Sequence, residues 1–184
     1  MTRPSEIPAL RGPLHHIGYN VENIPSAVAE WGKWGVGPFV VFEHMQFDEL
    51  TYMGAPCVFD HSTALASFGE VFVELQEVHE AGPPAFAAQL GGVPACANAV
   101  NHIAYFSADP VEDSARFEAA GFPLTCRIRL GNHEDRMHYV PCLGHGIELH
   151  SDSPALREMF AWIRAEAETW DGTAPIRTIP LPAI

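Results

Sequence analysis

The chain has 184 residues, of which 47% are hydrophobic, and its mean hydropathy is close to zero. These values are typical of a globular protein and exclude a disordered or fibrous chain. Its 23 acidic and 10 basic side chains give a formal net charge of −13, which repels nucleic-acid phosphates and anionic membrane surfaces.

The lack of a recognisable signal peptide, membrane span or cysteine pair narrows the class of protein further. The first residues lack the apolar core of a signal peptide, and no apolar run reaches the roughly 18 residues that a membrane-spanning helix needs. The four cysteines are scattered without a CxxC pair, which disfavours a zinc knuckle or a disulfide framework. We therefore expect a cytoplasmic protein that binds neither membranes nor nucleic acid.

The first half of the chain is predicted to be mainly β-structure. After a proline-containing arm, a strand begins at Leu14, and alternation along it sends His16 to one face and His15 to the other. Asn23 is placed to cap a short helix that ends before Gly35. Further strands are predicted at 39–42, 52–59, 62–68 and 71–76, with a polar segment at 43–49. Glu74 stands out because a carboxylate in so apolar a strand needs a partner or a metal.

A second unit is predicted after the Gly- and Pro-rich stretch that begins at Ala81. It has a strand at His102, a helix over 110–120, strands at 123–130, 136–140 and 144–150, and an exposed hairpin around 132–135. Ser153 caps a final helix with apolar residues at helical spacing, and an extended tail follows. The predicted units are 1–12 (arm), 13–80 (first module), 81–98 (linker), 99–152 (second module) and 153–184 (C-terminal helix and tail).

The two units read as copies of one module. His16 and His102 are 102 − 16 = 86 positions apart, and the same offset carries Trp31 to Phe117 and Gly35 to Gly121. An acid on the last strand of each unit, Glu74 and Glu148, completes the parallel. Two histidines and two glutamates at matching places in two copies favour one shared site over four unrelated packing roles.

This pattern resembles the vicinal oxygen chelate superfamily, also called the glyoxalase/bleomycin-resistance/dioxygenase superfamily. The resemblance covers roughly residues 13 to 150, and the motifs at His16-Ile17-Gly18 and His102-Ile103-Ala104 are similar to the opening strand of methylmalonyl-CoA epimerases. It implies an α+β fold in which two βαβββ modules form a cupped, barrel-like mixed sheet, here followed by a C-terminal helix. It also implies a homodimer.

The resemblance further implies that one divalent metal ion is held by four residues: His16, Glu74, His102 and Glu148. Two imidazoles and two carboxylates suit Zn, Co, Ni, Mn or Fe and leave coordination positions free for substrate. The expected function is that of an isomerase, epimerase or lyase. It would transfer a proton next to the carbonyl of a small carbonyl or acyl-thioester substrate, through a metal-stabilised enolate.

Two other functions stay open at this stage. A metal-free protein that sequesters a drug or metabolite would have an apolar, aromatic cavity. An iron-dependent extradiol-type dioxygenase of this superfamily would carry a histidine at the place of Glu74. The catalytic base is also open, because Glu43 resembles in position a non-ligand glutamate of the epimerases, Glu148 could leave the metal to take a proton, and Glu43 could equally be a solvated loop acid. Three arginines are candidate carboxylate or phosphate contacts: Arg127, Arg129 and Arg136.

Overall fold

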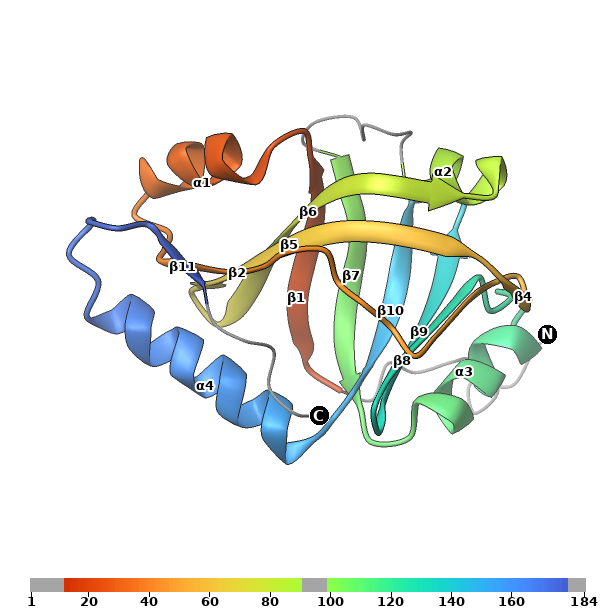
Figure 1. Ribbon diagram of the computed structural model, residues 1–184. Helices are drawn as coiled ribbons and strands as arrows, with labels where there is room; N and C mark the ends of the chain where they lie inside the picture. The colour runs from red at the N-terminus through yellow and green to blue at the C-terminus, as the bar shows by residue number, and fades with distance from the viewer. Residues whose placement is uncertain (1–11, 91–98, 179–184) are drawn as a thin grey trace.

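The computed structural model of the chain describes residues 12–90 and 99–178, which form one mixed β-sheet with four helices around it (Figure 1). The strands before residue 90 are β1 (Leu14–Val21), β2 (Phe39–Phe42), β3 (Glu49–Tyr52), β4 (Ala55–Pro56), β5 (Val58–Phe68) and β6 (Val71–Gly82). Those after it are β7 (Ala99–Ser107), β8 (Cys126–Leu130), β9 (His133–Val140), β10 (His145–Ser151) and β11 (Ile176–Thr178). The helices are α1 (Ile24–Gly32), α2 (Pro84–Gln89), α3 (Pro110–Ala119) and α4 (Pro154–Glu168).

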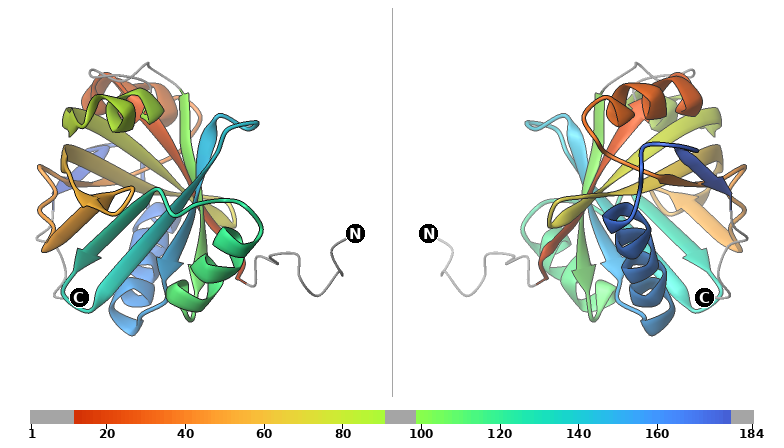
Figure 2. Two further views of the ribbon diagram at one scale, coloured as in Figure 1. Left: turned by 90° about the vertical axis from the view of Figure 1, so that its right-hand side faces the viewer. Right: turned by 90° about the vertical axis from the view of Figure 1, so that its left-hand side faces the viewer.

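The sheet repeats one arrangement twice about its centre. Its order is β11-β2-β5-β6-β1-β7-β10-β9-β8-β3-β4, with β1 and β7 antiparallel in the middle. β1 pairs in parallel with β6 and β7 with β10, and each pair is followed by an antiparallel neighbour, β5 or β9. The sheet curves strongly but remains open at its β11 and β4 edges (Figure 2). The predicted α+β class and mixed, cupped sheet are confirmed.

Local signals in the sequence account for the helices. The side chain of Asn23 accepts a hydrogen bond from the Ser26 backbone and starts α1, and Asp109 and Ser153 do the same for α3 and α4. The C-terminal α4 buries its apolar face, Leu156, Phe160 and Ile163, in a cluster with Phe42 and Phe72 among others. This helix therefore closes one side of the sheet's concave face.

The segment between residues 49 and 68 differs from its prediction. Two strands, 52–59 and 62–68, were expected, but the structure has the short β3–β4 hairpin followed by one long β5. Asp60 does not end β5, because a register shift between Asp60 and His61 lets the pairing with β6 continue. β3 also leaves its own half of the sheet and pairs with β8, so the two halves share an edge.

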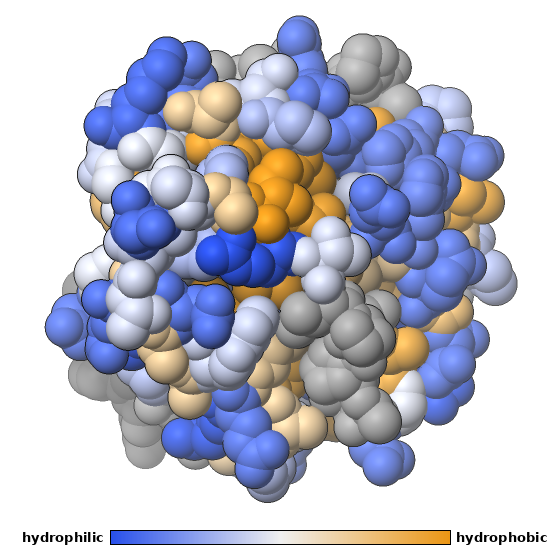
Figure 3. Space-filling model, turned by 60° about the vertical axis from the view of Figure 1, so that its left-hand side comes forward, coloured by the Kyte–Doolittle hydropathy of each residue, from blue (hydrophilic) through white to orange (hydrophobic). Residues whose placement is uncertain are grey.

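Parts of three predicted segments lie outside the described residues: 1–11 of the arm, 91–98 of the linker and 179–184 of the tail. Within the described part of the chain, no helix is both long and apolar enough to cross a membrane. The face turned forward in Figure 3 is largely hydrophilic, with apolar side chains gathered in a recess near its middle.

Candidate metal centre

The strand register brings the two halves of the sequence motif together. Gly18, two residues after His16, lies opposite Glu74 on β6 and opposite His102 on β7. Ala104, two residues after His102, lies opposite Glu148 on β10 and opposite His16 on β1. The small residue in each half is thus flanked by its own glutamate and by the other half's histidine.

Gly18 leaves the space that the His102 ring fills. A Cβ atom at Gly18 would lie 2.3 Å from Cε1 and 2.7 Å from Nε2 of His102, far closer than ordinary contact. The glycine in the first motif is therefore required by side-chain packing across the strand pair. The matching place in the second half accepts Ala104, which is fully buried.

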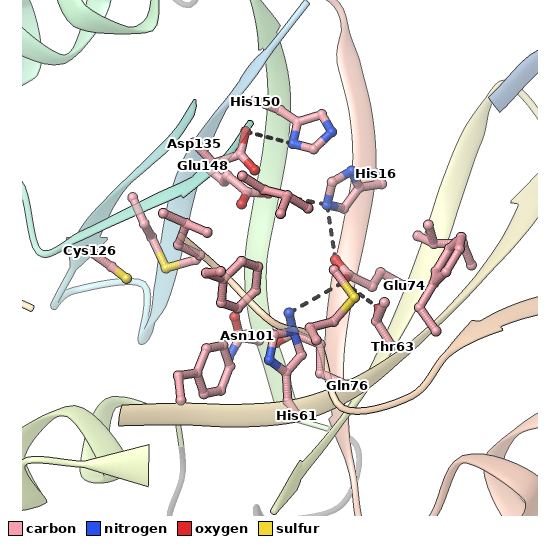
Figure 4. Close-up of a pocket in the computed structure, with 18 of the residues that line it drawn as sticks. His16, His61, Thr63, Glu74, Gln76, Asn101, Cys126, Asp135, Glu148 and His150 are labelled. Atoms are coloured by element: carbon pink, nitrogen blue, oxygen red, sulfur yellow. Dashed lines mark hydrogen bonds and ion pairs between the residues drawn. The ribbon is translucent and has the colours of Figure 1, made fainter. Parts of the chain in front are cut away.

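Four donor atoms from four strands converge beside these residues, and Figure 4 shows three of the four side chains, His16, Glu74 and Glu148. Nε2 of His16 lies 2.9 Å from Nε2 of His102, 3.2 Å from Oε2 of Glu74 and 3.3 Å from Oε2 of Glu148. Nε2 of His102 lies 3.1 and 3.4 Å from the same two carboxylate oxygens. All four side chains are buried. The structure thus places each of the two carboxylates within 3.4 Å of both imidazoles, while the group of donor atoms that all lie within 4.8 Å of one another comprises His16, His102 and Glu148 without Glu74.

A hydrogen-bond chain orients His102. The Leu90 carbonyl can only accept, so Asn20 Nδ2 donates to it at 2.5 Å, and Asn101 Nδ2 donates to Asn20 Oδ1 at 3.1 Å. Asn101 Oδ1 therefore faces Nδ1 of His102 at 2.7 Å and must accept a proton from it. With Nδ1 protonated, the neutral ring directs the lone pair of Nε2 at the convergence point.

His15 plays the corresponding part for His16. Sequence alternation turned His15 away, but a register shift between Leu14 and His16 places its Nδ1 2.8 Å from Nδ1 of His16. Burial, assisted by the charge of His16, lowers the pKa of His15 to about 2. Neutral His15 accepts the Nδ1 proton of His16, which leaves Nε2 of His16 facing the two carboxylates.

The two carboxylates are held differently. Oε1 of Glu74 accepts from Thr63 Oγ1 at 2.5 Å and from Gln76 Nε2 at 3.4 Å, which fixes its orientation. Glu148 contacts the two histidines through Oε2; burial and, to a smaller extent, the charge of Asp135 would raise its pKa, but His102 and His16 outweigh them and lower it. Glu74 is therefore anchored on the protein side, whereas Glu148 has fewer restraints.

The electrostatics of the cluster call for a positive charge at its centre. Burial alone would lower the pKa of His16, but contacts with Glu148 and Glu74 outweigh it and raise that pKa to about 10. Burial would likewise raise the pKa of Glu74, yet hydrogen bonds from His102 and His16 hold it well below its usual range. A single His16 proton would have to serve three acceptors. A divalent cation, which takes a lone pair from each of four donors, fits this set better.

Three of the four side chains, His16, Glu74 and Glu148, line a cavity of about 120 Å³ beneath α4, while the buried His102 is not among its lining residues. Most of the other lining residues are apolar: Phe42, Met45, Phe47, Phe59, Leu65, Phe86, Leu90, Cys126, Ile128, Leu130, Met137, Leu156, Met159 and Phe160. No lysine or arginine is among the described residues that line it. The apolar walls exclude water, which strengthens every electrostatic interaction at the centre.

With this geometry in place, comparisons with known proteins decide the family. Residues 15–139 match the model of the Glyoxalase/Bleomycin resistance protein/Dioxygenase superfamily, also named Glyoxalase_4. The chain belongs to this superfamily. No curated protein matches the chain significantly.

Solved structures share the superfamily fold at low sequence identity. A hypothetical protein from Bacillus halodurans is 16% identical with a TM-score of 0.52, over 78% of this chain and 96% of that one. Methylmalonyl-CoA epimerase from Streptomyces coelicolor, a variant in complex with 2-nitronate-propionyl-CoA, is 19% identical with a TM-score of 0.51, over 79% and 99%. The Mycobacterium tuberculosis methylmalonyl-CoA epimerase is 16% identical with a TM-score of 0.50, over 86% and 97%. These likenesses support the fold alone.

The remaining residues singled out in the sequence lie away from the centre of this superfamily member. Glu43 follows β2 as an exposed residue and is not among those that line the cavity. Arg127 binds Glu49 at 2.5 Å and Glu134 at 2.7 Å, so its charge is already paired outside the cavity. Arg129 and Arg136 pair with the same two acids. These arginines are not free to bind a substrate anion in the cavity.

Sequence analysis missed several residues of the cavity wall. The segment 132–135 was expected to be an exposed hairpin, but His133 and Asp135 are buried and line the cavity with His150. In the sequence, the positions of His133 and Asp135 alternate with those of Glu134 and Arg136, which are half-buried in the structure; this alternation is the feature that could have indicated a strand with two different faces. His138 lies on the opposite face of β9, where it contacts Ser114 Oγ at 2.9 Å and the Phe122 carbonyl at 3.0 Å.

Proposed function

We propose that this chain is a divalent-metal-dependent isomerase, epimerase or lyase that moves a proton at the carbon next to a carbonyl group. The observation that supports it is the convergence of two imidazole nitrogens and two carboxylate oxygens in a buried, largely apolar cavity. Superfamily membership, shown by the match over residues 15–139, agrees with such chemistry.

The donor set suits a resident metal ion in both distance and charge. Ligands about 2.1 Å from one ion and at right angles to each other lie about 3.0 Å apart, and tetrahedral ligands lie about 3.4 Å apart. The five donor pairs that include a histidine nitrogen are 2.9 to 3.4 Å apart, and donor atoms of His16, His102 and Glu148 all lie within 4.8 Å of one another, a group that leaves out Glu74. Four residues would hold the ion: His16, Glu74, His102 and Glu148. When bound, it would supply Lewis-acid polarisation of a substrate carbonyl oxygen.

Glu148 is the residue we assign as the base that takes the proton. Glu74 is tied by Thr63 and Gln76, so it serves best as a fixed ligand. Glu148 shares the face of β10 with His150 and lines the cavity, and its carboxylate can turn toward a substrate carbon without breaking such bonds. The exposed Glu43 receives no role in this proposal.

The lining of the cavity points to the class of substrate. Aromatic and aliphatic side chains are the majority of the lining, and seven polar ones beyond the donor set accompany them: His61, Thr63, Gln76, Asn101, His133, Asp135 and His150. With no lysine or arginine among its described lining, the cavity favours an uncharged apolar group beside the reacting carbonyl. We therefore propose a small ketone, aldehyde or acyl thioester whose carbonyl end is apolar.

Metal analysis and isotope exchange test this function. The purified protein should contain about one equivalent of metal at this centre, and His16→Ala and His102→Ala should each remove it. His145→Ala, a half-buried histidine on β10 outside the donor set, is the matched control and should retain it. In deuterated water, metal-loaded protein should exchange the α-proton of its substrate, and EDTA should abolish exchange. Full metal retention by both histidine variants would reject the proposal.

A second candidate function rests on the apolar lining. A protein that sequesters a hydrophobic metabolite would also need a cavity walled by aromatic residues such as Phe59, Phe86 and Phe160. It would bind its ligand without metal, and EDTA would leave that binding unchanged. Ligand-binding titrations with metal-loaded and EDTA-treated protein separate the two functions.

A further inference from the structure

A second cluster of potential ligands lines the same cavity. His133 and Asp135 on β9 are buried, and His150 on β10 lies across the strand pair from them with a side chain that is 12% exposed. One donor atom from each of the three lies within 4.8 Å of the others. We propose that His133, Asp135 and His150 form a second metal site, independent of the first.

The strands place all three side chains on the cavity face. His133, Asp135 and Met137 alternate along β9 and all line the cavity, while the residues between them point outward. His150 is two residues after Glu148 on β10, so both face the same side of the sheet. The three side chains therefore belong to the wall of the cavity rather than to the surface hairpin.

The contacts within the cluster have the geometry of ligands that share an ion. His133 Nε2 lies 2.8 Å and His150 Nδ1 3.0 Å from the two oxygens of Asp135, close to the separation of about 3.0 Å expected for neighbouring ligands. His150 Nδ1 and Asp135 Oδ1 form an ion pair when the ring carries a proton on Nδ1, and this contact is the dashed line between the two side chains in Figure 4. The same atoms are close enough to be neighbouring ligands of one ion.

Unpartnered nitrogens add a second observation. His133 Nδ1 and His150 Nε2 are buried without a hydrogen-bond partner, so each ring has one unsatisfied nitrogen. A buried polar atom left unpaired costs about 1–3 kcal/mol, and such atoms gather at functional sites. Coordination would use one nitrogen of each ring and leave the other able to donate to water or substrate.

Charge within the cavity favours a second cation. Three buried carboxylates line it, Glu74, Glu148 and Asp135, and no lysine or arginine among the described lining residues offsets them. One divalent ion at the first centre leaves one negative charge uncompensated. A second divalent ion, held by two imidazoles and one carboxylate, would more than compensate for it, leaving one positive charge, and would keep open positions for substrate or water.

The two metal sites would contact a substrate in the same cavity. The rings of His150 and His16 have their centroids 5.5 Å apart, so both clusters face the same cavity. The donor set favours ions that accept nitrogen and oxygen ligands, such as Zn²⁺, Co²⁺, Ni²⁺ or Fe²⁺. A bifunctional substrate with two neighbouring oxygens would suit such a pair.

Stoichiometry of Co²⁺ binding tests this inference. Chelator-stripped protein is titrated with Co²⁺ by equilibrium dialysis and visible absorption, alongside Asp135→Asn and His133→Gln, with circular dichroism to verify folding. Wild-type protein should bind two ions, and each variant should lose one or bind it at least tenfold more weakly. Met137→Leu on the same face of β9 is the matched control, and His44→Ala removes an exposed cluster with Asp60 and His79 that has similar donors.

Each outcome separates this site from the first one. A single equivalent in the wild-type protein, lost in His16→Ala, overturns the second site and leaves the proposed function intact. A second equivalent that disappears only in His44→Ala belongs to the surface cluster and also overturns it. Loss of an ion in Asp135→Asn and His133→Gln, with no loss in His16→Ala, supports the second site and rejects the first.

Discussion

Replacing Gly18 by alanine tests the packing that seats His102. The added Cβ would lie 2.3 Å from Cε1 of His102, whereas ordinary contact starts at 3.4 Å, so the ring must retreat by about 1.1 Å. The neighbouring hydrogen bond from His102 to Asn101 opposes this movement. Ligand positions in a metal site tolerate only about 0.2 Å, so His102 would no longer fit the ion.

We expect Gly18→Ala to weaken Zn²⁺ or Co²⁺ binding at the first centre by at least tenfold, the lower end of what disturbing a ligand's support costs. Overpacking should also reduce the free energy of unfolding of the metal-free protein by about 1–3 kcal/mol. Competition with a metal-sensitive dye measures the metal affinity, and urea unfolding measures the free energy of unfolding.

Gly32→Ala in α1 is the control, since its new Cβ would meet only Trp170 at 3.9 Å and should leave metal affinity unchanged. Wild-type metal affinity in Gly18→Ala would refute the reasoning, because it would mean that the His102 ring moves freely or is not a ligand.

Three other substitutions have distinct readouts. Asn101→Leu removes the acceptor that fixes the His102 ring and should weaken metal binding by about 10–100-fold in dye competition, whereas Asn101→Asp keeps that acceptor, loses only the bond to Asn20 Oδ1, and should weaken binding less. Burial lowers the pKa of His138 below 6.5, so the unfolded chain takes up a proton that the folded chain refuses, and stability falls as the pH drops below 6.5. His138→Gln should make that fall shallower in urea midpoints at pH 7.5 and 5.5, and an unchanged slope would contradict the assignment. Phe160→Ala should cost about 3–5 kcal/mol of unfolding free energy, because the ring is 4% exposed between α4 and the sheet, and a loss below 1 kcal/mol would show that α4 adds little to the core.

The fold and the first donor set can be predicted from the sequence because the module occurs twice, each time with one histidine and one glutamate. The shared offset of His16 and His102, and the acids in two apolar strands, identify residues whose convergence depends only on strand order. The second cluster is harder to predict, since His133 and Asp135 follow a turn and have no counterpart in the first half. Alternation with Glu134 shows which residues share a face, but only the curvature of the sheet shows that this face lines the cavity.

His15 shows where a local rule fails. Strict alternation turned His15 away from the site, and one register shift reversed that outcome. For Glu43 the sequence left a catalytic base and a solvated loop acid open, and the structure exposes this side chain just after β2. Irregularities of a single residue are nearly invisible in a sequence, yet they decide which side chains reach a site.

The pairing of Gly18 with His102 and of Ala104 with His16 has a consequence for folding. Each half of the chain provides the small residue against which the other half's histidine packs, so a fragment ending after β6 would contain His16 and Glu74 but not a complete cation site. Capture of the ion would then await the docking of β7 against β1, so tight binding would mark the moment at which the whole polypeptide has reached its native topology.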